Sequence, residues 1–412
     1  MRTLLLIPLL FLMGSIPIPI SHYLKPVWSV KRTITNPTNE LNSYFGIRLS
    51  MSGDYLVIGA YQEDVTFADQ GQAYVYHRTG EDWTLQATLV SPNPSASGKF
   101  ASDVDMYGDY IVVGEELADV GGFTDQGRAY VYHRNGATWP LEATINNPTN
   151  QSLKNFGNAV SIYGDDIIVA SFADDTPAGN AGRCYIFHRS GTTWPLQGNL
   201  PNPTGESESY FGTDVAIAGD YALVGAYTED APNFDQGQAY IYFRTGVTWA
   251  LQATLANPTA ETSSWYGAWL ALDGDYALVS AYGEDNPNSN TGVAYMYHRS
   301  GTTWPLQKTI VNPSNEVNSY FGGALELKGD YAFIGSGTED LRVADEGLLY
   351  MYKRTGVNWD IVKLFTAPGT EVNSAFPNFS SMSGDYIAIA AFLRNGVGTD
   401  EGGVYIFKRN TL

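Results

Sequence analysis

The sequence lacks features that would indicate a disulfide-stabilised protein, a nucleic-acid-binding protein or a protein with a membrane span in its mature chain. Its 412 residues include one cysteine, Cys184, so an internal disulfide is excluded. Lysine and arginine number 23 against 43 aspartates and glutamates, a formal net charge of −20, which argues against nucleic acid as a partner because phosphate binding needs basic surfaces. Beyond the N-terminus no segment is apolar for long enough to span a bilayer. We expect a monomer with an acidic surface.

The first 21 residues have the pattern of a secretory signal peptide. Arg2 supplies a short positive region, residues 4–13 are apolar, and small residues and prolines follow. Prolines within this stretch make it a poor membrane-spanning helix. We therefore expect residues 1–21 to be a signal peptide and the mature protein to be secreted or held at the cell surface, with an uncleaved anchor as the alternative. Sequons at Asn150 and Asn378 predict a glycoprotein.

Three markers recur along the chain at intervals of 55 or 56 residues, which is typical of a repeat architecture. The first is an aspartate that follows glycine: Asp54, Asp109, Asp165, Asp220, Asp275, Asp330 and Asp385. The second is a tryptophan: Trp28, Trp83, Trp139, Trp194, Trp249, Trp304 and Trp359. The third is an arginine: Arg78, Arg134, Arg189, Arg244, Arg299, Arg354 and Arg409.

Each repeat divides into four short strand-like runs. In the first complete repeat these are residues 45–51, 55–61, 72–78 and 83–89, separated by turn residues. The second run is apolar almost throughout, as expected for a strand that is covered on both faces. Seven such units predict an all-β fold, a seven-bladed β-propeller of four-stranded antiparallel blades, with residues 22–412 forming one domain.

The two ends of the repeat array complement each other. Residues 27–34, VWSVKRTI, match the fourth strand of a unit, whereas the last unit stops shortly after its third strand. We expect the N-terminal strand to complete the last blade and close the ring, which would leave no exposed sheet edge between the ends.

The recurring markers have structural explanations. Gly-Asp stands between two strands with no room for a loop, so we interpret it as a two-residue hairpin turn. Where a tryptophan follows one of these arginines, it stands five residues later, on the other side of a second hairpin turn. We expect the arginine to lie over the indole ring, a cation–π contact that would contribute roughly 0.5–2 kcal/mol. The strand-end histidines lie on different blades and cannot converge on a metal: His77, His133, His188 and His298.

The first strand of a unit often carries Phe-Gly, as at Phe45-Gly46 and Phe156-Gly157, and the second often ends in Gly-Ala, as at Gly59-Ala60. This pattern resembles the FG-GAP repeat, best known from the propellers of integrin α-subunits. The stretch RSGTTWPLQ, which begins at Arg189 and again at Arg299, is similar to the bacterial-type branch of that repeat. The resemblance implies a propeller fold and a role in adhesion or recognition.

Integrin-type repeats often hold calcium in the connection between the first two strands. Here that connection is only MSGD or similar, which is too short to supply six to eight oxygen ligands. We therefore do not expect the calcium sites of integrin-type repeats in this protein. The longer connection after the second strand carries acidic residues that we expect to be Asx turns and loop caps, with calcium binding as the alternative. Two such sets are Glu63, Asp64 and Asp69, and Glu229, Asp230 and Asp235. No other cofactor is expected.

Only first-strand residues and loop tips near the axis can gather from several blades. The variable first-strand position holds Arg48, Asp103, Ala159, Asp214, Trp269, Ala324 and Phe379. The fifth blade adds Trp265, which like Trp269 lies outside the repeating tryptophan register and either stacks on a ligand or fills the channel. The candidate ligand-binding residues are therefore Arg48, Asp103, Asp214, Trp265 and Trp269, and no catalytic residue is assigned.

These observations favour a secreted, non-enzymatic binding or adhesion propeller that recognises a glycan or an extracellular protein. One alternative is an extracellular polysaccharide-active enzyme with an axial site, for which Asp103 and Asp214 would be the acid and base. Titratable groups with shifted pKa values, clustered in one axial pocket, would favour that enzyme. A structural scaffold within a surface assembly is a further alternative.

Overall fold

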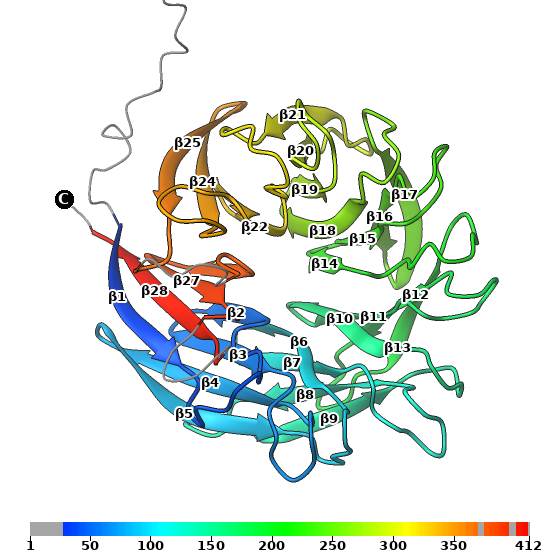
Figure 1. Cartoon of the computed structure of the whole chain (residues 1–412). Helices are drawn as coiled ribbons and strands as arrows, with labels where there is room; N and C mark the ends of the chain where they lie inside the picture. The colour runs from blue at the N-terminus through cyan, green and yellow to red at the C-terminus, as the bar shows by residue number, and fades with distance from the viewer. Residues whose placement is uncertain (1–27, 370–374, 395–400, 411–412) are drawn as a thin grey trace, which may run out of the picture.

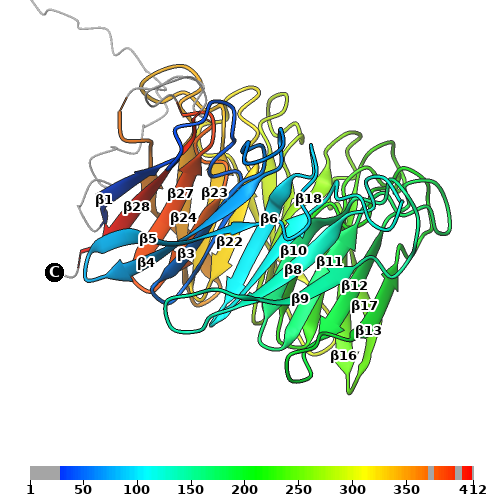
Figure 2. The ribbon, with the colours of Figure 1, turned by 90° about the horizontal axis from the view of Figure 1, so that it is seen from below.

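Seven antiparallel sheets of four strands stand in a ring around a central axis, as predicted (Figure 1). The computed structural model describes residues 28–369, 375–394 and 401–410, and the predicted signal peptide lies outside these residues. Within them the regular structure is entirely β-strand, with no helix. Figure 2 shows longer loops along one side of the ring and hairpin turns along the other.

Each blade runs outward from the axis in chain order. Blade 1 has β2 (Leu49–Ser52), β3 (Tyr55–Ala60), β4 (Gln72–Thr79) and β5 (Asp82–Val90). Blade 2 has β6 (Phe100–Tyr107), β7 (Tyr110–Glu115), β8 (Arg128–His133) and β9 (Leu141–Asn146). Blade 3 has β10 (Phe156–Tyr163), β11 (Asp166–Ser171), β12 (Arg183–His188) and β13 (Leu196–Pro201). Blade 4 has β14 (Val215–Ala218), β15 (Tyr221–Ala226), β16 (Gln238–Thr245) and β17 (Thr248–Ala256).

The other three blades repeat this pattern. Blade 5 has β18 (Tyr266–Asp273), β19 (Tyr276–Ala281), β20 (Val293–His298) and β21 (Leu306–Val311). Blade 6 has β22 (Ala324–Lys328), β23 (Tyr331–Ser336), β24 (Leu348–Thr355) and β25 (Asn358–Phe365). Blade 7 has β26 (Ser380–Ser383), β27 (Tyr386–Ala391), β28 (Gly403–Arg409) and, from the other end of the chain, β1 (Trp28–Thr35).

The predicted closure of the ring is confirmed. Strand β1 pairs antiparallel with β28, with Trp28 opposite Arg409 and Thr35 opposite Gly403 (Figure 1). The outermost strand of blade 7 therefore comes from the N-terminal segment, and the two ends of the described chain lie side by side.

The hydrophobic core is divided among the seven spaces between neighbouring blades. Each of seven clusters of buried residues combines side chains from two adjacent sheets, and the cluster between blades 7 and 1 includes Ile406 and Leu56. The second strand of a blade contributes to the clusters on both of its faces, which explains its almost continuous apolar sequence. Cys184 occupies a buried position in one of these clusters, and burial raises the pKa of its thiol.

The recurring aspartate does more than form a turn. Gly53 takes a φ of 59° at the first turn position, as the glycine of a tight hairpin does, while Asp54 pairs through its carboxylate with Arg78 of the same blade. The same ion pair recurs in the other six blades: Arg134–Asp109, Arg189–Asp165, Arg244–Asp220, Arg299–Asp275, Arg354–Asp330 and Arg409–Asp385.

The predicted stacking of an arginine on the tryptophan that follows it is wrong in five of the six blades where a tryptophan follows. In those five blades, and in blade 7 where none follows, the arginine lies instead over the tyrosine that follows Gly-Asp in the preceding blade, as Arg134 does over Tyr55 at 4.9 Å from the ring centroid. The equivalent contacts are Arg78–Tyr386, Arg189–Tyr110, Arg299–Tyr221, Arg354–Tyr276 and Arg409–Tyr331. Trp139 meets the same Tyr55 ring edge-on, so arginine and tryptophan both hold the neighbouring blade.

Blade 3 shows why the tyrosine matters. Asp166 replaces the tyrosine there, and Arg244 of blade 4 forms an ion pair with Asp166 at 2.7 Å. Only this arginine lies over its own tryptophan, with the guanidinium carbon of Arg244 at 5.4 Å from the Trp249 ring. At this junction the carboxylate of Asp166 takes the place of the tyrosine ring as the partner of the arginine, so blades 3 and 4 remain in contact.

Each strand-end histidine contacts a residue of its own blade. Three of them stack on the tyrosine of their own blade, with centroid distances of 4.6 Å for Tyr55–His77, 4.3 Å for Tyr110–His133 and 4.4 Å for Tyr276–His298. His188 instead lies with Nδ1 at 2.8 Å from Asp166.

We expect Gly127→Ala to destabilise the protein far more than Gly136→Ala. Both glycines have positive φ, 81° and 63°, so alanine costs about 1–2 kcal/mol at either position for the backbone alone. A Cβ at Gly127 would also press into the Phe156 carbonyl oxygen of blade 3, whereas one at Gly136 meets nothing within 4 Å. Urea unfolding should show a loss of about 3 kcal/mol or more for Gly127→Ala. Equal losses would show that the blades do not approach closely there.

A double-mutant cycle should distinguish the two aromatic partners of an arginine. We expect Arg134 to couple to Tyr55 by about 0.5–1 kcal/mol in the free energy of unfolding, since the contact is partly exposed. The matched cycle between Arg134 and Trp139 should give a smaller coupling energy. A larger coupling to Trp139 would contradict the observed stacking.

Candidate functional site

The candidate site begins at the axis, where the variable first-strand position brings several blades together. The guanidinium carbon of Arg48 lies 4.9 Å from the ring centroid of Trp269 and 5.0 Å from that of Phe379, so this cation is held between two aromatic faces. Its Nε is 3.3 Å from Asp103 Oδ1. An axial cavity of about 200 Å³ is lined by Asp103, Asp214, Trp269 and Phe379 among others. Four of the five candidate residues thus meet here.

Asp103 and Asp214 each connect two blades. Oδ2 of Asp103 accepts a hydrogen bond from the backbone N–H of Val160 at 2.7 Å, and Oδ2 of Asp214 accepts one from Leu270 at 2.7 Å. Their other oxygens accept the N–H of the residue that follows each aspartate. Burial raises the pKa of Asp103 to about 7 and that of Asp214 to about 6, and the charge of Arg48 opposes both shifts.

Sequence analysis missed two further carboxylates deeper in the channel. Asp105 Oδ2 accepts the N–H of Ile162 at 2.9 Å, and Glu326 Oε1 accepts that of Met382 at 2.6 Å. Burial raises the pKa of Glu326 to about 7. Both residues stand two positions after the variable position, so the period of two along a strand was the available signal. These side chains satisfy backbone groups on the inner edge of the neighbouring sheet.

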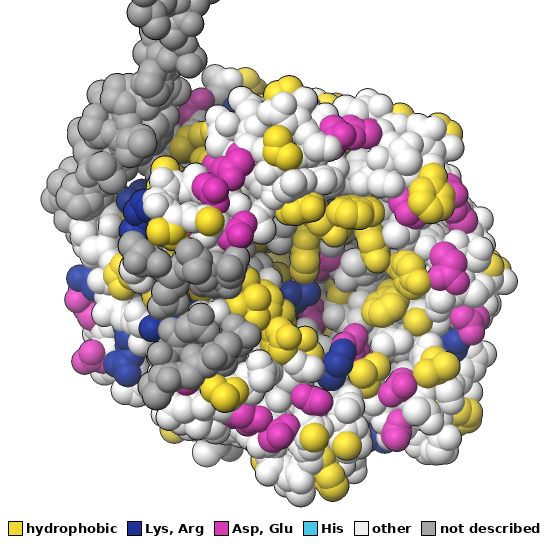
Figure 3. All heavy atoms as spheres, viewed as in Figure 1, with side chains coloured by type: hydrophobic (Ala, Val, Ile, Leu, Met, Phe, Trp, Pro, Cys, Tyr) yellow, Lys and Arg dark blue, Asp and Glu magenta, His cyan; other side chains and the backbone are white. Residues whose placement is uncertain are grey.

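The mouth of the channel on the long-loop side is surrounded by aromatic rings that contact one another. They come from two positions of a blade, wherever these are aromatic: the residue before Phe-Gly (Tyr-Gly in blade 5) and the residue after the second strand. Tyr44, for example, lies 5.2 Å from Tyr61 and 5.4 Å from Phe392 between ring centroids. We call the set the aromatic crown: Tyr44, Tyr61, Phe172, Tyr210, Tyr227, Trp265, Tyr282, Tyr320 and Phe392. Figure 3 shows hydrophobic side chains gathered around the central hollow on this face.

Trp265 belongs to the crown rather than to the axial cluster. Its ring lies 5.1 Å from that of Tyr282 and packs on Gly283, where a Cβ would collide with the indole. Tyr44, Tyr210, Trp265 and Tyr320 have φ values of 55°, 49°, 53° and 52°, a region that bulky residues rarely occupy. Sequence analysis identified only the tryptophan, although tyrosine before Phe-Gly was a visible signal.

Comparison with models of known protein families shows which family this chain belongs to. The FG-GAP repeat matches the chain five times, over residues 28–76, 83–132, 139–187, 194–242 and 249–297. The chain belongs to the FG-GAP repeat family. A search of curated proteins finds no significant match. The FG-GAP propeller supports a ligand-binding or adhesion type of function in general terms, and no helix of the described residues is long and apolar enough to cross a membrane.

In this FG-GAP protein the loop carboxylates are used for internal hydrogen bonds. Glu229 is fully buried, and its Oε1 accepts the hydroxyl of Tyr240 at 2.6 Å. Asp230 Oδ1 accepts the N–H of Asp235 at 2.8 Å, and Asp235 has a φ of 48°. The equivalent residues of blade 1 behave alike: Glu63 is buried, Asp64 caps the N–H of Asp69, and Asp69 has a φ of 51°. These are Asx-type loop caps.

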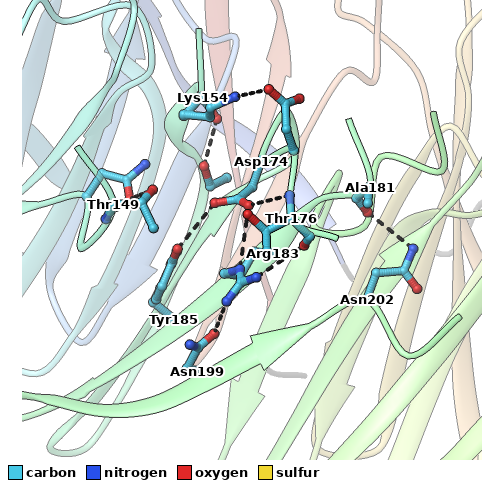
Figure 4. Close-up of polar contacts among 12 residues, drawn as sticks. Thr149, Lys154, Asp174, Thr176, Ala181, Arg183, Tyr185, Asn199 and Asn202 are labelled. Atoms are coloured by element: carbon cyan, nitrogen blue, oxygen red, sulfur yellow. Dashed lines mark hydrogen bonds and ion pairs between the residues drawn. The ribbon is translucent and has the colours of Figure 1, made fainter. Parts of the chain in front are cut away.

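Blade 3 departs from this pattern (Figure 4). A shorter Asp174 takes the place of the buried glutamate and lies 3.3 Å from the Tyr185 hydroxyl, with Arg183 Nε at 3.6 Å. Lys154 is buried and paired with Asp175, at a position where blades 1, 4, 5 and 6 have serine and blade 2 has glycine. That serine accepts an asparagine amide in blade 1, so Asn147 Nδ2 is left without a partner in blade 3.

The described residues hold no group of three or more His, Cys, Asp or Glu side chains placed to bind a metal ion. The two sequons differ in their surroundings. Asn150 is exposed in a loop, whereas Asn378 is half-buried and donates its side-chain amide to the Ile47 carbonyl at 2.7 Å.

The raised pKa of Asp103 predicts that stability falls as the pH rises. Its folded pKa of about 7 lies above the unfolded value of about 3.9, so between these values the folded state binds more protons. The free energy of unfolding should therefore decrease with pH up to about 7, by at most about 1.4 kcal/mol per pH unit for this group.

Urea unfolding between pH 5 and pH 8 measures this slope. Asp103→Asn should flatten it, while the exposed Asp360→Asn should leave it unchanged. Equal slopes for Asp103→Asn and the unaltered protein would show that Asp103 does not titrate in this range.

Proposed function

We propose that this FG-GAP propeller is a non-enzymatic binding or adhesion protein that holds a glycan or protein ligand at the aromatic crown. The observation that carries the proposal is the ring of half-buried aromatic side chains around the mouth of the axis. Rings that are rigidly placed and partly exposed provide a large contact area at a low cost in side-chain entropy, which is why such residues are enriched at recognition surfaces. A purely structural scaffold would not need to keep these rings accessible.

Two observations support an extracellular ligand. FG-GAP repeats are typical of extracellular or surface proteins, and the N-terminal sequence has the pattern of a secretory signal. We propose that the mature chain is a secreted or surface-held monomer. Glycosylation would occur at Asn150, which is exposed, rather than at Asn378, whose amide is engaged in the fold.

The axial enzyme is the second candidate, because Asp103 and Asp214 share a cavity and burial raises the pKa of both carboxyls. Against catalysis, both oxygens of each carboxylate already accept backbone N–H groups. Release of reducing sugars or unsaturated products from neutral and acidic polysaccharides, abolished by Asp103→Asn, would favour the enzyme.

We further propose that binding needs no metal, because the loop carboxylates are engaged with the chain itself. Calcium titration followed by calorimetry tests this point. A melting temperature that rises with calcium would instead assign the ion to these loops.

Trp265→Ala and Tyr210→Ala should each weaken ligand binding by about 3–10-fold, as expected for the loss of one aromatic stacking contact. A glycan array and a pull-down against surface proteins identify the ligand, and titration then measures its affinity. Val357→Ala, an exposed residue in a hairpin turn on the other side of the ring, is the control and should bind normally. Empty results from both screens would overturn the proposed function.

A further inference from the structure

One segment of the aromatic crown lacks its rings. The residue after the second strand is aromatic in blades 1, 3, 4, 5 and 7, but it is Gly337 in blade 6. The residue before Phe-Gly is aromatic in blades 1, 4, 5 and 6, but the equivalent residue of blade 7 is Ala375. Two neighbouring ring positions are thus vacated at the junction between blades 6 and 7.

The crown is also interrupted at Asn155 in blade 3, where a single ring is missing, and in blade 2, where the space is filled. In blade 2 the two positions hold Lys99 and Glu116, which form an ion pair at 3.2 Å. The Lys99 ammonium also lies 5.4 Å from the Tyr61 ring centroid, so the side chains of blade 2 continue the crown. By contrast, a cavity of about 380 Å³ opens beside Gly337 and Ala375, and its size lies within the usual range of about 300–1,000 Å³ for ligand sites.

The walls of this cavity suit one flat ring. Trp269, Tyr282 and Tyr320 line it, and Pro377 adds a further apolar surface. Neighbouring rings of the crown are in contact at varied angles, such as 22° for Tyr210–Tyr227 and 59° for Tyr282–Tyr320, the pair that lines this cavity. An occupant that replaces the missing rings would therefore meet aromatic side chains on more than one side.

One polar group of the cavity is an acceptor without an internal partner. Asp345 lines the cavity, and its carboxylate has no hydrogen-bonding partner among the described residues. The Thr338 hydroxyl is engaged with the Asn318 carbonyl, and one N–H of the Asn378 amide is engaged with Ile47. The second N–H of that amide can donate, and the hydroxyls of Tyr282 and Tyr320 can donate or accept. The site therefore suits an occupant that both donates and accepts hydrogen bonds, with at least one donor for Asp345.

Charge narrows the choice to a neutral ligand. An acidic sugar would be repelled by Asp345. A cation would be attracted by Asp345, but it would also be repelled by Arg48, which already lies over the Trp269 ring that walls the cavity, so the two charges together favour neither sign. A neutral pyranose has an apolar face of C–H groups, several hydroxyl donors and no charge.

We propose that the gap at Gly337 and Ala375 is a subsite for one neutral pyranose residue of a glycan. This inference rests on the proposed function and specifies its ligand. The pyranose ring stacks between the aromatic walls, and its hydroxyls donate to the Asp345 carboxylate.

The test fills the gap with the ring that other blades carry. Gly337→Tyr places tyrosine where Tyr227 and Tyr282 stand in blades 4 and 5, and a Cβ at Gly337 meets nothing within 4 Å, so we expect the variant to fold. Asn155→Tyr is the control, because it adds a tyrosine at another non-aromatic crown position, the blade 3 equivalent of Ala375, away from the gap. Melting temperatures check that both variants are folded.

The probes are the methyl glycosides of glucose, galactose, mannose and N-acetylglucosamine, with glucuronic acid and arginine methyl ester as charged counterparts. Saturation-transfer NMR should detect at least one neutral glycoside with the unaltered protein and with Asn155→Tyr. Binding should be at least tenfold weaker for Gly337→Tyr, and glucuronic acid should bind at least tenfold more weakly than glucose.

Three results would overturn the subsite. They are no binding of any neutral glycoside, equal binding by Gly337→Tyr, or displacement of the glycoside by arginine methyl ester at lower concentration. A glycan or protein that binds in the screens and is lost with Trp265→Ala but not with Gly337→Tyr would overturn the subsite alone and leave the proposed function in place.

Discussion

The structure depends on one constraint: each sheet must have both faces covered by another sheet. The buried clusters lie between blades rather than within one central core, so no blade has a complete core of its own. The pairing of β1 with β28 completes the outermost edge of the last blade, and the ring then leaves no blade without neighbours on both sides. Side chains that bridge neighbouring blades, such as Arg134 over Tyr55 and Asp103 on Val160, add directional contacts to this packing.

The sequence allowed the fold to be predicted because a propeller is a periodic object. The spacing of Asp54 and its equivalents defined the number of blades, and the unmatched strand at Trp28 indicated how the ring closes. The partner of each arginine could not be predicted in this way. Trp139 is five residues from Arg134 in the chain, whereas Tyr55 belongs to the preceding blade, and only the placement of the sheets brings it closer to the guanidinium.

The periodicity of the sequence also allowed part of the candidate site to be predicted. The variable first-strand position could be recognised because it breaks the repeat, and the structure brings Arg48, Asp103 and Trp269 together at the axis. The crown was harder to predict, since it combines residues from two connections of a blade whose side chains meet both within a blade and across blade boundaries. The gap at Gly337 is visible in the sequence as a missing aromatic residue, but its meaning depends on knowing that the other rings contact one another around the mouth of the channel.

The matched segments have a consequence for how such proteins change over evolutionary time. A match such as 83–132 begins in the outer strand of one blade and ends in the third strand of the next. The sequence repeat that a duplication would copy is therefore offset by one strand from the blade, whose four strands are hydrogen-bonded into one sheet. Inserting or deleting one copy would change the circumference of the ring while every sheet, including the one shared by the two chain ends, kept its complement of strands.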